Sequence, residues 1–164
     1  MTENRCNTVL VAFCAVPKIM QEYDAAFKSR LQSSFMSAHL RRGVPTQKLM
    51  EEMLEINRKK ARLLILQDTV RAALSSLPSA LSDILLLRFS KGKTFQEIAL
   101  IQDITIRTAF RRFDKARDDF AAELDRRGLD EKTFTETYLS DPAVAAVCAR
   151  LSDGEYFTAK SVRE

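Results

Sequence analysis

The stretch that decides the fold is LPSALSDILLLRFSKGKTFQEIALIQDITIRTAFRRFDKARDDF, residues 77–120. Its apolar residues recur at helical spacing in three successive segments, and this pattern predicts three consecutive helices. Pro78 suits the first position of the first helix, and Gly92 suits its end. Thr94 and Glu97 stand three residues apart, as they do in a capping box, so we expect the second helix to begin there.

The third helix is expected after a connector of about three to four residues. Thr105 can cap it, and the helix is expected to continue past Arg117 and to stop at Gly128. Its inward-facing residues would be Ile104, Ala109, Phe113 and Ala116. Two helices joined by so short a connector are what a helix-turn-helix requires.

These three segments resemble the fourth region of bacterial RNA polymerase sigma factors. The resemblance covers about a quarter of the chain. The residues that carry it are Leu77-Pro78, Leu86-Leu87-Arg88-Phe89, Gly92, Thr94, Glu97-Ile98-Ala99, Ile104-Thr105, Thr108 and Ala116-Arg117. The chain departs from the family pattern at Gln102, where an apolar residue is usual, and at Asp103, where Gly is common. Asp tolerates the left-handed backbone of such a turn better than most residues do.

The resemblance implies a DNA-binding motif that contacts promoter DNA near the −35 element, with RNA polymerase as partner. It does not extend to residues 1–76, where the aromatic and Trp residues of the sigma region that melts the −10 element are missing. A stand-alone sigma-like transcription regulator, of the kind found in phage and mobile elements, therefore fits better than a complete sigma factor.

In a helix-turn-helix, the second helix places its N-terminal side chains against base edges in the major groove. Carried over by position, the groove-facing residues would be Thr105, Ile106, Arg107, Thr108, Phe110 and Arg111. The residues placed for phosphate contacts would be Lys93, Thr94, Arg112 and Lys115. Phe110 fits least well, because an exposed Phe here predicts either an apolar contact to a base or packing against the C-terminal segment.

Charge distribution favours double-stranded DNA as the partner. From Ile104 to Arg117 there are five basic residues against the single acid Asp114, an excess of +4 over one helix. Residues 129–164 carry a net charge of −3, so they do not form a nucleic-acid arm. A basic helix face can also be plain solvated surface, and the competing function is a protein-interaction module that binds a partner through its helical hairpin, with weak or no DNA binding.

The rest of the chain also favours helices, because 164 residues contain only four Gly and four Pro. We therefore predict an all-α fold with an N-terminal helical hairpin or dimerisation region (1–76), a helix-turn-helix domain (77–128) and a short helical C-terminal extension (129–164). A short, weak helix is expected within residues 129–140. Asp141 and Pro142 should open the last helix, which runs to Leu151.

The hairpin would consist of a helix from Pro17 to Arg42, ended by Gly43 and Pro45, and a second helix from Thr46 to about Ser75. The run 8–16 before it could be a helical turn or a strand-like piece. One apolar column of the second helix repeats every seven residues: Leu49, Ile56, Leu63, Val70 and Leu77. This column predicts the core of an antiparallel hairpin, and the alternative is a homodimer through Leu49, Ile56, Leu63 and Val70.

No residue pattern indicates catalysis, so we expect no enzymatic activity. Cys6, Cys14 and Cys148 are odd in number and lack metal-ligand spacing, so we expect neither a disulfide framework nor a metal or other cofactor. A reduced, cytoplasmic location fits these thiols, and no run approaches the length of a membrane span.

Overall fold

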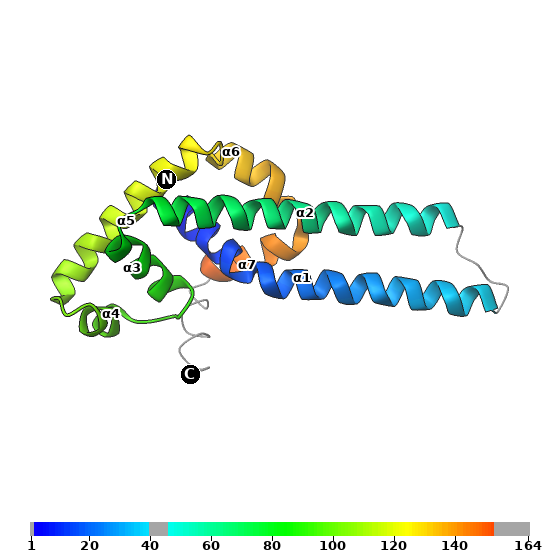
Figure 1. Ribbon diagram of the computed structural model, residues 1–164, viewed down its shortest axis with the longest axis horizontal. Helices are drawn as coiled ribbons and strands as arrows, with labels where there is room; N and C mark the ends of the chain where they lie inside the picture. The colour runs from blue at the N-terminus through cyan, green and yellow to red at the C-terminus, as the bar shows by residue number, and fades with distance from the viewer. Residues whose placement is uncertain (1, 40–45, 153–164) are drawn as a thin grey trace.

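The computed structural model describes residues 2–39 and 46–152, and within them the chain is helical and contains no strand (Figure 1). The predicted all-α class is confirmed. The hairpin consists of α1 (Thr2–His39) and α2 (Thr46–Ser76). The helix-turn-helix region consists of α3 (Ser79–Phe89), α4 (Phe95–Ile101) and α5 (Ile106–Arg126). The C-terminal segment consists of α6 (Glu131–Phe134), the π-helical turn η1 (Thr135–Leu139) and α7 (Pro142–Ser152).

Helices α1 and α2 run antiparallel side by side, and the far end of the hairpin projects away from the other helices (Figure 1). Arg30 of α1 pairs with Glu52 of α2 at 2.6 Å, and Asp24 pairs with Lys60 at 2.5 Å. The second pair explains how a lysine is accommodated beside the apolar column of α2.

The seven-residue column of α2 faces the interior of the hairpin. Leu63 and Val70 are buried by the chain's own residues, whereas Leu49 and Ile56 are half-buried toward the far end. The column is therefore the hairpin core, and the alternative of a dimer seam through Leu49, Ile56, Leu63 and Val70 is wrong for this structure, because α1 already covers it. Burying two apolar helix faces against each other within one chain avoids the entropic cost of association.

The first helix begins far earlier than predicted. Helix α1 starts at Thr2 and passes without interruption through Pro17, where a start was expected. Pro17 removes one intrahelical hydrogen bond, and burial of the flanking Val16 and Ile19 offsets this loss. The ambiguous run 8–16 is thus helical. Gly43 and Pro45, predicted to end the first helix, lie outside the described residues. Thr46, where the second helix was expected to begin, is the first residue of α2.

The N-terminal half of α1 packs against α5 and α7 and joins the core of the helix-turn-helix region. Val9 and Leu10 are fully buried there, together with Phe120 of α5 and Val144 of α7. Polar contacts reinforce the packing at both ends: Arg5 donates to Asp125 at 2.7 Å, and the Tyr23 hydroxyl donates to Asp141 at 2.5 Å. The hairpin, the motif and the C-terminal segment therefore share one hydrophobic core.

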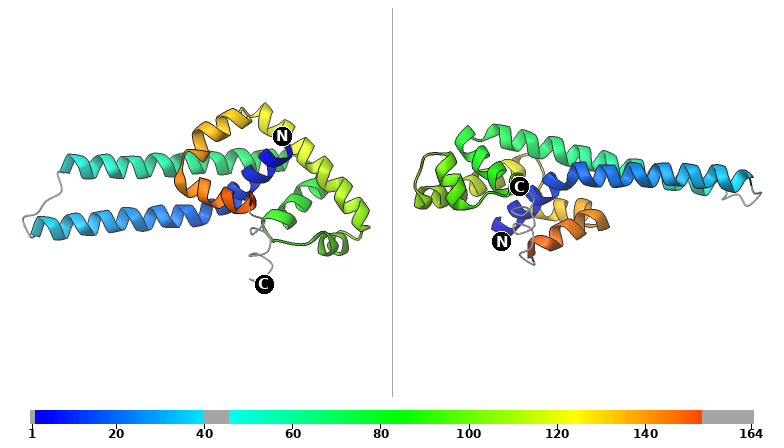
Figure 2. Two further views of the ribbon diagram at one scale, coloured as in Figure 1. Left: turned by 180° about the vertical axis from the view of Figure 1, so that it is seen from behind. Right: turned by 90° about the horizontal axis from the view of Figure 1, so that it is seen from below.

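The C-terminal segment forms the short helices that the sequence predicts. The Asp130 carboxylate accepts a hydrogen bond from the Thr133 N–H at 2.7 Å and begins α6. The Asp141 carboxylate accepts one from the Ala143 N–H at 3.0 Å at the start of α7. Figure 2 shows α7 lying beside the N-terminal half of α1. Within the described residues, none of the helices combines the length and the apolar character needed to cross a bilayer.

Because Leu10 is completely buried in this shared core, we expect Leu10→Ala to lower the free energy of unfolding by about 2–5 kcal/mol. Urea denaturation followed by circular dichroism measures the change. Phe35→Ala is the matched control, since Phe35 lies exposed toward the far end of α1. Equal losses for the two variants would contradict the central position of the N-terminal half of α1.

Candidate nucleic-acid interface

The start of α4 carries the predicted capping box. The Glu97 N–H donates to the Thr94 hydroxyl at 3.2 Å, and the Thr94 N–H donates to the Glu97 carboxylate at 2.7 Å. The hydrogen bond from the Thr94 backbone is the main reason that the pKa of the Glu97 carboxyl lies below its ordinary value. These two residues fix where the first helix of the motif begins.

The turn between α4 and α5 is closed by backbone hydrogen bonds around Asp103. Asp103 takes a left-handed conformation with φ of 51°, and the Ile104 N–H donates to the Ala99 carbonyl at 2.9 Å. This is the hydrogen-bond pattern by which a helix commonly ends when a Gly follows it. The prediction that Asp can serve at this position is confirmed. Thr105 then caps α5, because its hydroxyl accepts from the Thr108 N–H at 3.2 Å.

Gln102 bridges three elements, which accounts for a polar residue where the family pattern has an apolar one. Its side-chain amide nitrogen donates to the Ala80 carbonyl of α3 at 3.2 Å. Its side-chain oxygen accepts from the guanidinium of Arg112 on α5 at 3.5 Å. Arg112, predicted to contact phosphate, is half-buried and lies against this amide.

Phe110 packs on the first helix of the motif. Its ring centroid lies 4.2 Å from that of Phe95, and Phe95 also meets Phe113 edge-on at 5.1 Å. Among the described residues, the ring that Phe110 contacts belongs to Phe95, the first residue of α4, and not to the C-terminal segment. The ring remains 47 % exposed, so one face of it is presented to solvent at the surface of the motif.

The predicted groove-facing side chains gather on the outer face of the first turns of α5. Thr105, Ile106, Arg107 and Arg111 are exposed, and Thr108 is half-buried beneath its capping hydrogen bond. Within residues 2–39 and 46–152, no ion pair involves Arg107 or Arg111. Both cations therefore face solvent on consecutive turns of one helix face.

The other cations of the motif are less freely placed. Lys93 lies 3.5 Å from Glu97, and Lys115 lies 3.4 Å from Asp119. Arg117 turns inward: its side chain pairs with Asp114 at 2.6 Å and covers the ring of Phe113. Of the five basic residues counted between Ile104 and Arg117, the two without an ion pair or a side-chain hydrogen bond among the described residues are therefore Arg107 and Arg111, near the N-terminus of α5.

Arg88 helps to hold the motif together. From the sequence we named it only as part of the family resemblance and assigned it no contact. Its guanidinium donates to the Lys93 carbonyl at 2.9 Å and lies over the ring of Phe95, 5.1 Å from its centroid. Burial lowers the pKa of this guanidinium, which nevertheless stays charged at neutral pH. Arg88 therefore fixes the connection between α3 and α4. The sequence signal that could have indicated this role is a basic residue near the end of an otherwise apolar helix.

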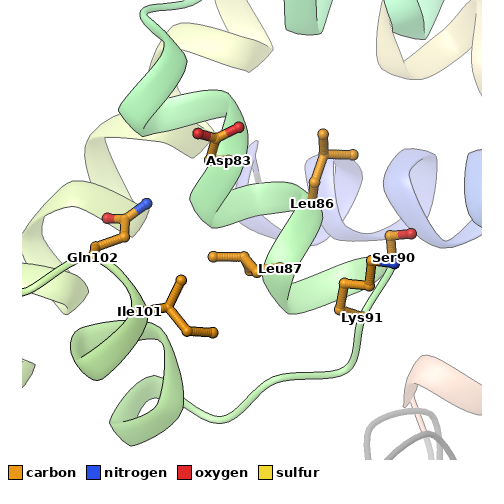
Figure 3. A pocket seen from close by; sticks show the side chains of 7 residues that line it. All are labelled: Asp83, Leu86, Leu87, Ser90, Lys91, Ile101 and Gln102. Atoms are coloured by element: carbon orange, nitrogen blue, oxygen red, sulfur yellow. The ribbon is translucent and has the colours of Figure 1, made fainter.

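A pocket of about 400 Å³ opens between α3 and the end of α4 (Figure 3). Leu87 from α3 and Ile101 from α4 point into it, with Asp83 and Gln102 at one side. Ile101 and its neighbour Leu100 are 56 % and 82 % exposed. The outer side of α4 thus presents apolar surface next to a hollow, a combination typical of protein-contact sites.

Residues 67–119 match a protein-family model described as sigma-70, region 4. The match begins in the last turns of α2, includes all of α3 and α4, and ends within α5. Neither a curated protein nor a solved structure shows significant similarity to the chain. The resemblance found in the sequence is confirmed: about a third of the chain is similar to sigma-70 region 4, and the structure folds this part into a helix-turn-helix.

The capping box predicts a specific dependence of stability on pH. The pKa of Glu97 is lowered in the folded chain, so its stabilising contribution is fully present above the unfolded value and is lost as the pH falls through the folded value. Gln at this position keeps an acceptor for the Thr94 N–H but does not titrate. We therefore expect the stability advantage of the wild type over Glu97→Gln to shrink between about pH 7 and about pH 3.

Urea denaturation of both proteins across this pH range makes the comparison. Glu22→Gln is the control, because Glu22 lies exposed on α1 and begins no helix. A difference between wild type and Glu97→Gln that is the same at every pH would contradict the lowered pKa.

Proposed function

We propose that the chain is a sequence-specific DNA-binding transcription regulator that reads promoter DNA with α5 in the manner of a sigma factor. The observation that carries this proposal is the pair Arg107 and Arg111. They are exposed on the outer face of a helix that stands second in a capped helix-turn-helix, inside the segment similar to sigma-70 region 4.

We infer the role of each residue from its position in the helix-turn-helix. Arg107 or Arg111 would donate two hydrogen bonds to a guanine, and Ile106 would touch a thymine methyl group. Phe110, supported from below by Phe95, would offer its exposed face to a neighbouring base. The phosphate contacts would come from Lys93, Thr94, Arg112 and Lys115, which fix the register of the protein on the duplex and make its affinity fall with rising salt.

We expect Arg107→Ala and Arg111→Ala to weaken specific binding, because a bidentate guanine contact is worth about 1–3 kcal/mol, roughly a 5- to 150-fold loss of affinity. A duplex selected from a randomised pool by the wild type serves as the probe, and gel shift over a salt series measures the affinity. Lys132→Ala is the control, because Lys132 is an exposed cation of the C-terminal segment. Unchanged affinity in both arginine variants would make the DNA-reading role untenable.

RNA polymerase is the protein partner that the resemblance implies, and the apolar outer side of α4 is a suitable contact surface. Leu100 and Ile101 are exposed there beside the pocket between α3 and α4, and solvation of two large apolar side chains is unfavourable unless a partner covers them.

We expect the double variant Leu100→Ser/Ile101→Ser to reduce capture of purified bacterial core polymerase at least about tenfold, which corresponds to about 1.4 kcal/mol of lost contact. The control is Phe35→Ser, which removes an equally exposed apolar side chain from the hairpin. Equal capture of polymerase by both variants would exclude the outer side of α4 as the polymerase contact. Absence of capture by the wild type would leave a DNA-binding regulator that acts without direct polymerase contact.

The competing function is a protein-interaction module that uses the helical hairpin and binds DNA weakly or not at all. Its supporting observation is the exposed Phe35 and Met36 near the far end of α1. The two functions differ in the gel shift: a regulator binds with salt-dependent affinity that requires Arg107 and Arg111, whereas an interaction module shows neither property.

A further inference from the structure

Helix α2 carries a second heptad pattern on its outward side. Its members follow one another at alternating spacings of four and three residues: Met50, Leu54, Asn57, Ala61 and Leu64. We call these five residues the outer seam. Met50, Leu54 and Leu64 are 59 %, 52 % and 48 % exposed, and the adjacent Ile65 is 60 % exposed. A spacing of four and three places side chains in one stripe along a helix, as in a coiled coil.

The outer seam is distinct from the column that forms the hairpin core. Leu63 and Val70 of that column are buried, whereas all five seam residues are exposed. Toward the far end of the hairpin, α1 is the only helix that runs beside α2 among the described residues (Figure 1). The seam is thus an apolar stripe that no described helix covers.

We propose that the outer seam pairs with the same seam of a second copy of this chain, with the two α2 helices antiparallel. The seam is nearly palindromic about Asn57. When two copies are aligned with Asn57 opposite Asn57, Met50 of one lies opposite Leu64 of the other, and Leu54 lies next to Ala61. A two-fold interface needs such self-complementarity, because the same patch serves on both sides.

The charges beside the seam select the antiparallel direction. One flank carries the acids Glu51 and Glu55 in the N-terminal part and the exposed bases Arg58 and Arg62 in the C-terminal part. In the antiparallel pair, Glu51 faces Arg62 of the second copy. Glu55 and Arg58, which lie 3.6 Å apart within one chain, meet the same pair of the second copy with opposite charges facing. In a parallel pair the acids lie together and the bases lie together, which is unfavourable. This charge pattern also disfavours a purely apolar partner peptide.

Asn57 determines the register in which the two α2 helices align. A polar residue within an apolar seam reduces stability, but it is best satisfied when two such side chains meet and hydrogen-bond. Only the alignment with Asn57 at the two-fold axis achieves this while keeping both sets of charge pairs. The side chain is exposed in the single chain, so it is accessible for this contact.

The antiparallel pair places the two helix-turn-helix motifs at opposite ends of the assembly. The C-terminal ends of the two α2 helices would lie about 57 Å apart, given a rise of 1.5 Å per residue from Asn57 to Ser76 in each chain. This exceeds the spacing of about 34–36 Å between half-sites one helical turn apart. The dimer would therefore not place its two motifs on half-sites only one helical turn apart, a consequence that rests on the proposed function, whereas the pairing itself does not.

Sedimentation of the full chain over a concentration series tests the pairing. We expect the mass to rise from one chain to two, and we expect Leu54→Glu/Leu64→Glu to stay at one chain at every concentration. Phe35→Glu, an exposed apolar residue outside the seam, should dimerise like the wild type. Circular dichroism melts establish that all variants are folded. A wild type that remains one chain throughout, or a double variant that still dimerises, would overturn the proposal.

Cysteine cross-linking tests the direction. Two copies of Asn57→Cys would meet at the two-fold axis and form a disulfide under oxidation. Two copies of Asp68→Cys would lie about 33 Å apart in an antiparallel pair but side by side in a parallel one. The wild type, which contains Cys6, Cys14 and Cys148, gives the background. Cross-linking of Asp68→Cys, or no cross-linking of Asn57→Cys, would overturn the antiparallel pairing.

Discussion

The N-terminal half of α1 packs between α5, α7 and the end of α2, and the position of the helix-turn-helix motif depends on this contact. Helix α5 is long and amphipathic, and its C-terminal half would expose Phe120 and Leu124 without a cover. Burying each such side chain contributes about 1.5–3 kcal/mol. Arg5 adds a directional contact by donating to Asp125 and to the Ala121 carbonyl. With this half of α5 held, its first turns project with α4 at the end of the molecule opposite the tip of the hairpin (Figure 1).

The sequence was sufficient for features whose signals lie within a few residues of one another. The capping box of Thr94 and Glu97 and the cap of Thr105 are short-range hydrogen bonds, which residue type and spacing alone predict. The left-handed Asp103 follows in the same way from the tolerance of Asp for that conformation. The all-α class and the sigma-like motif rest on many such signals taken together. In the motif, the same reasoning predicted that Ala109 and Phe113 face inward and that Arg107 and Arg111 face outward, as the structure shows.

The features that sequence reasoning missed depend on residues far apart in the chain. Pro17 is a strong local sign of a helix start, but the buried run around it keeps α1 continuous. The partners of Gln102 and Phe110 lie on neighbouring elements, so no local pattern indicates them. On α2, two heptad patterns differ by one position, and only the presence of α1 decides which is core and which is surface. The contact of Tyr23 with Asp141 spans most of the chain, so the packing of α7 could not be anticipated.

Nuclear magnetic resonance can test directly whether the helix-turn-helix motif is the surface that binds DNA, as proposed. Amide signals of the isotopically labelled full chain would be recorded while a duplex selected by the wild type is added. We expect the largest shifts at Thr94 and across the first turns of α5, from Thr105 to Arg111, with little change in the far half of the hairpin. Shifts confined to the hairpin, or no shifts at concentrations where the duplex is bound, would contradict the role of this motif in reading DNA.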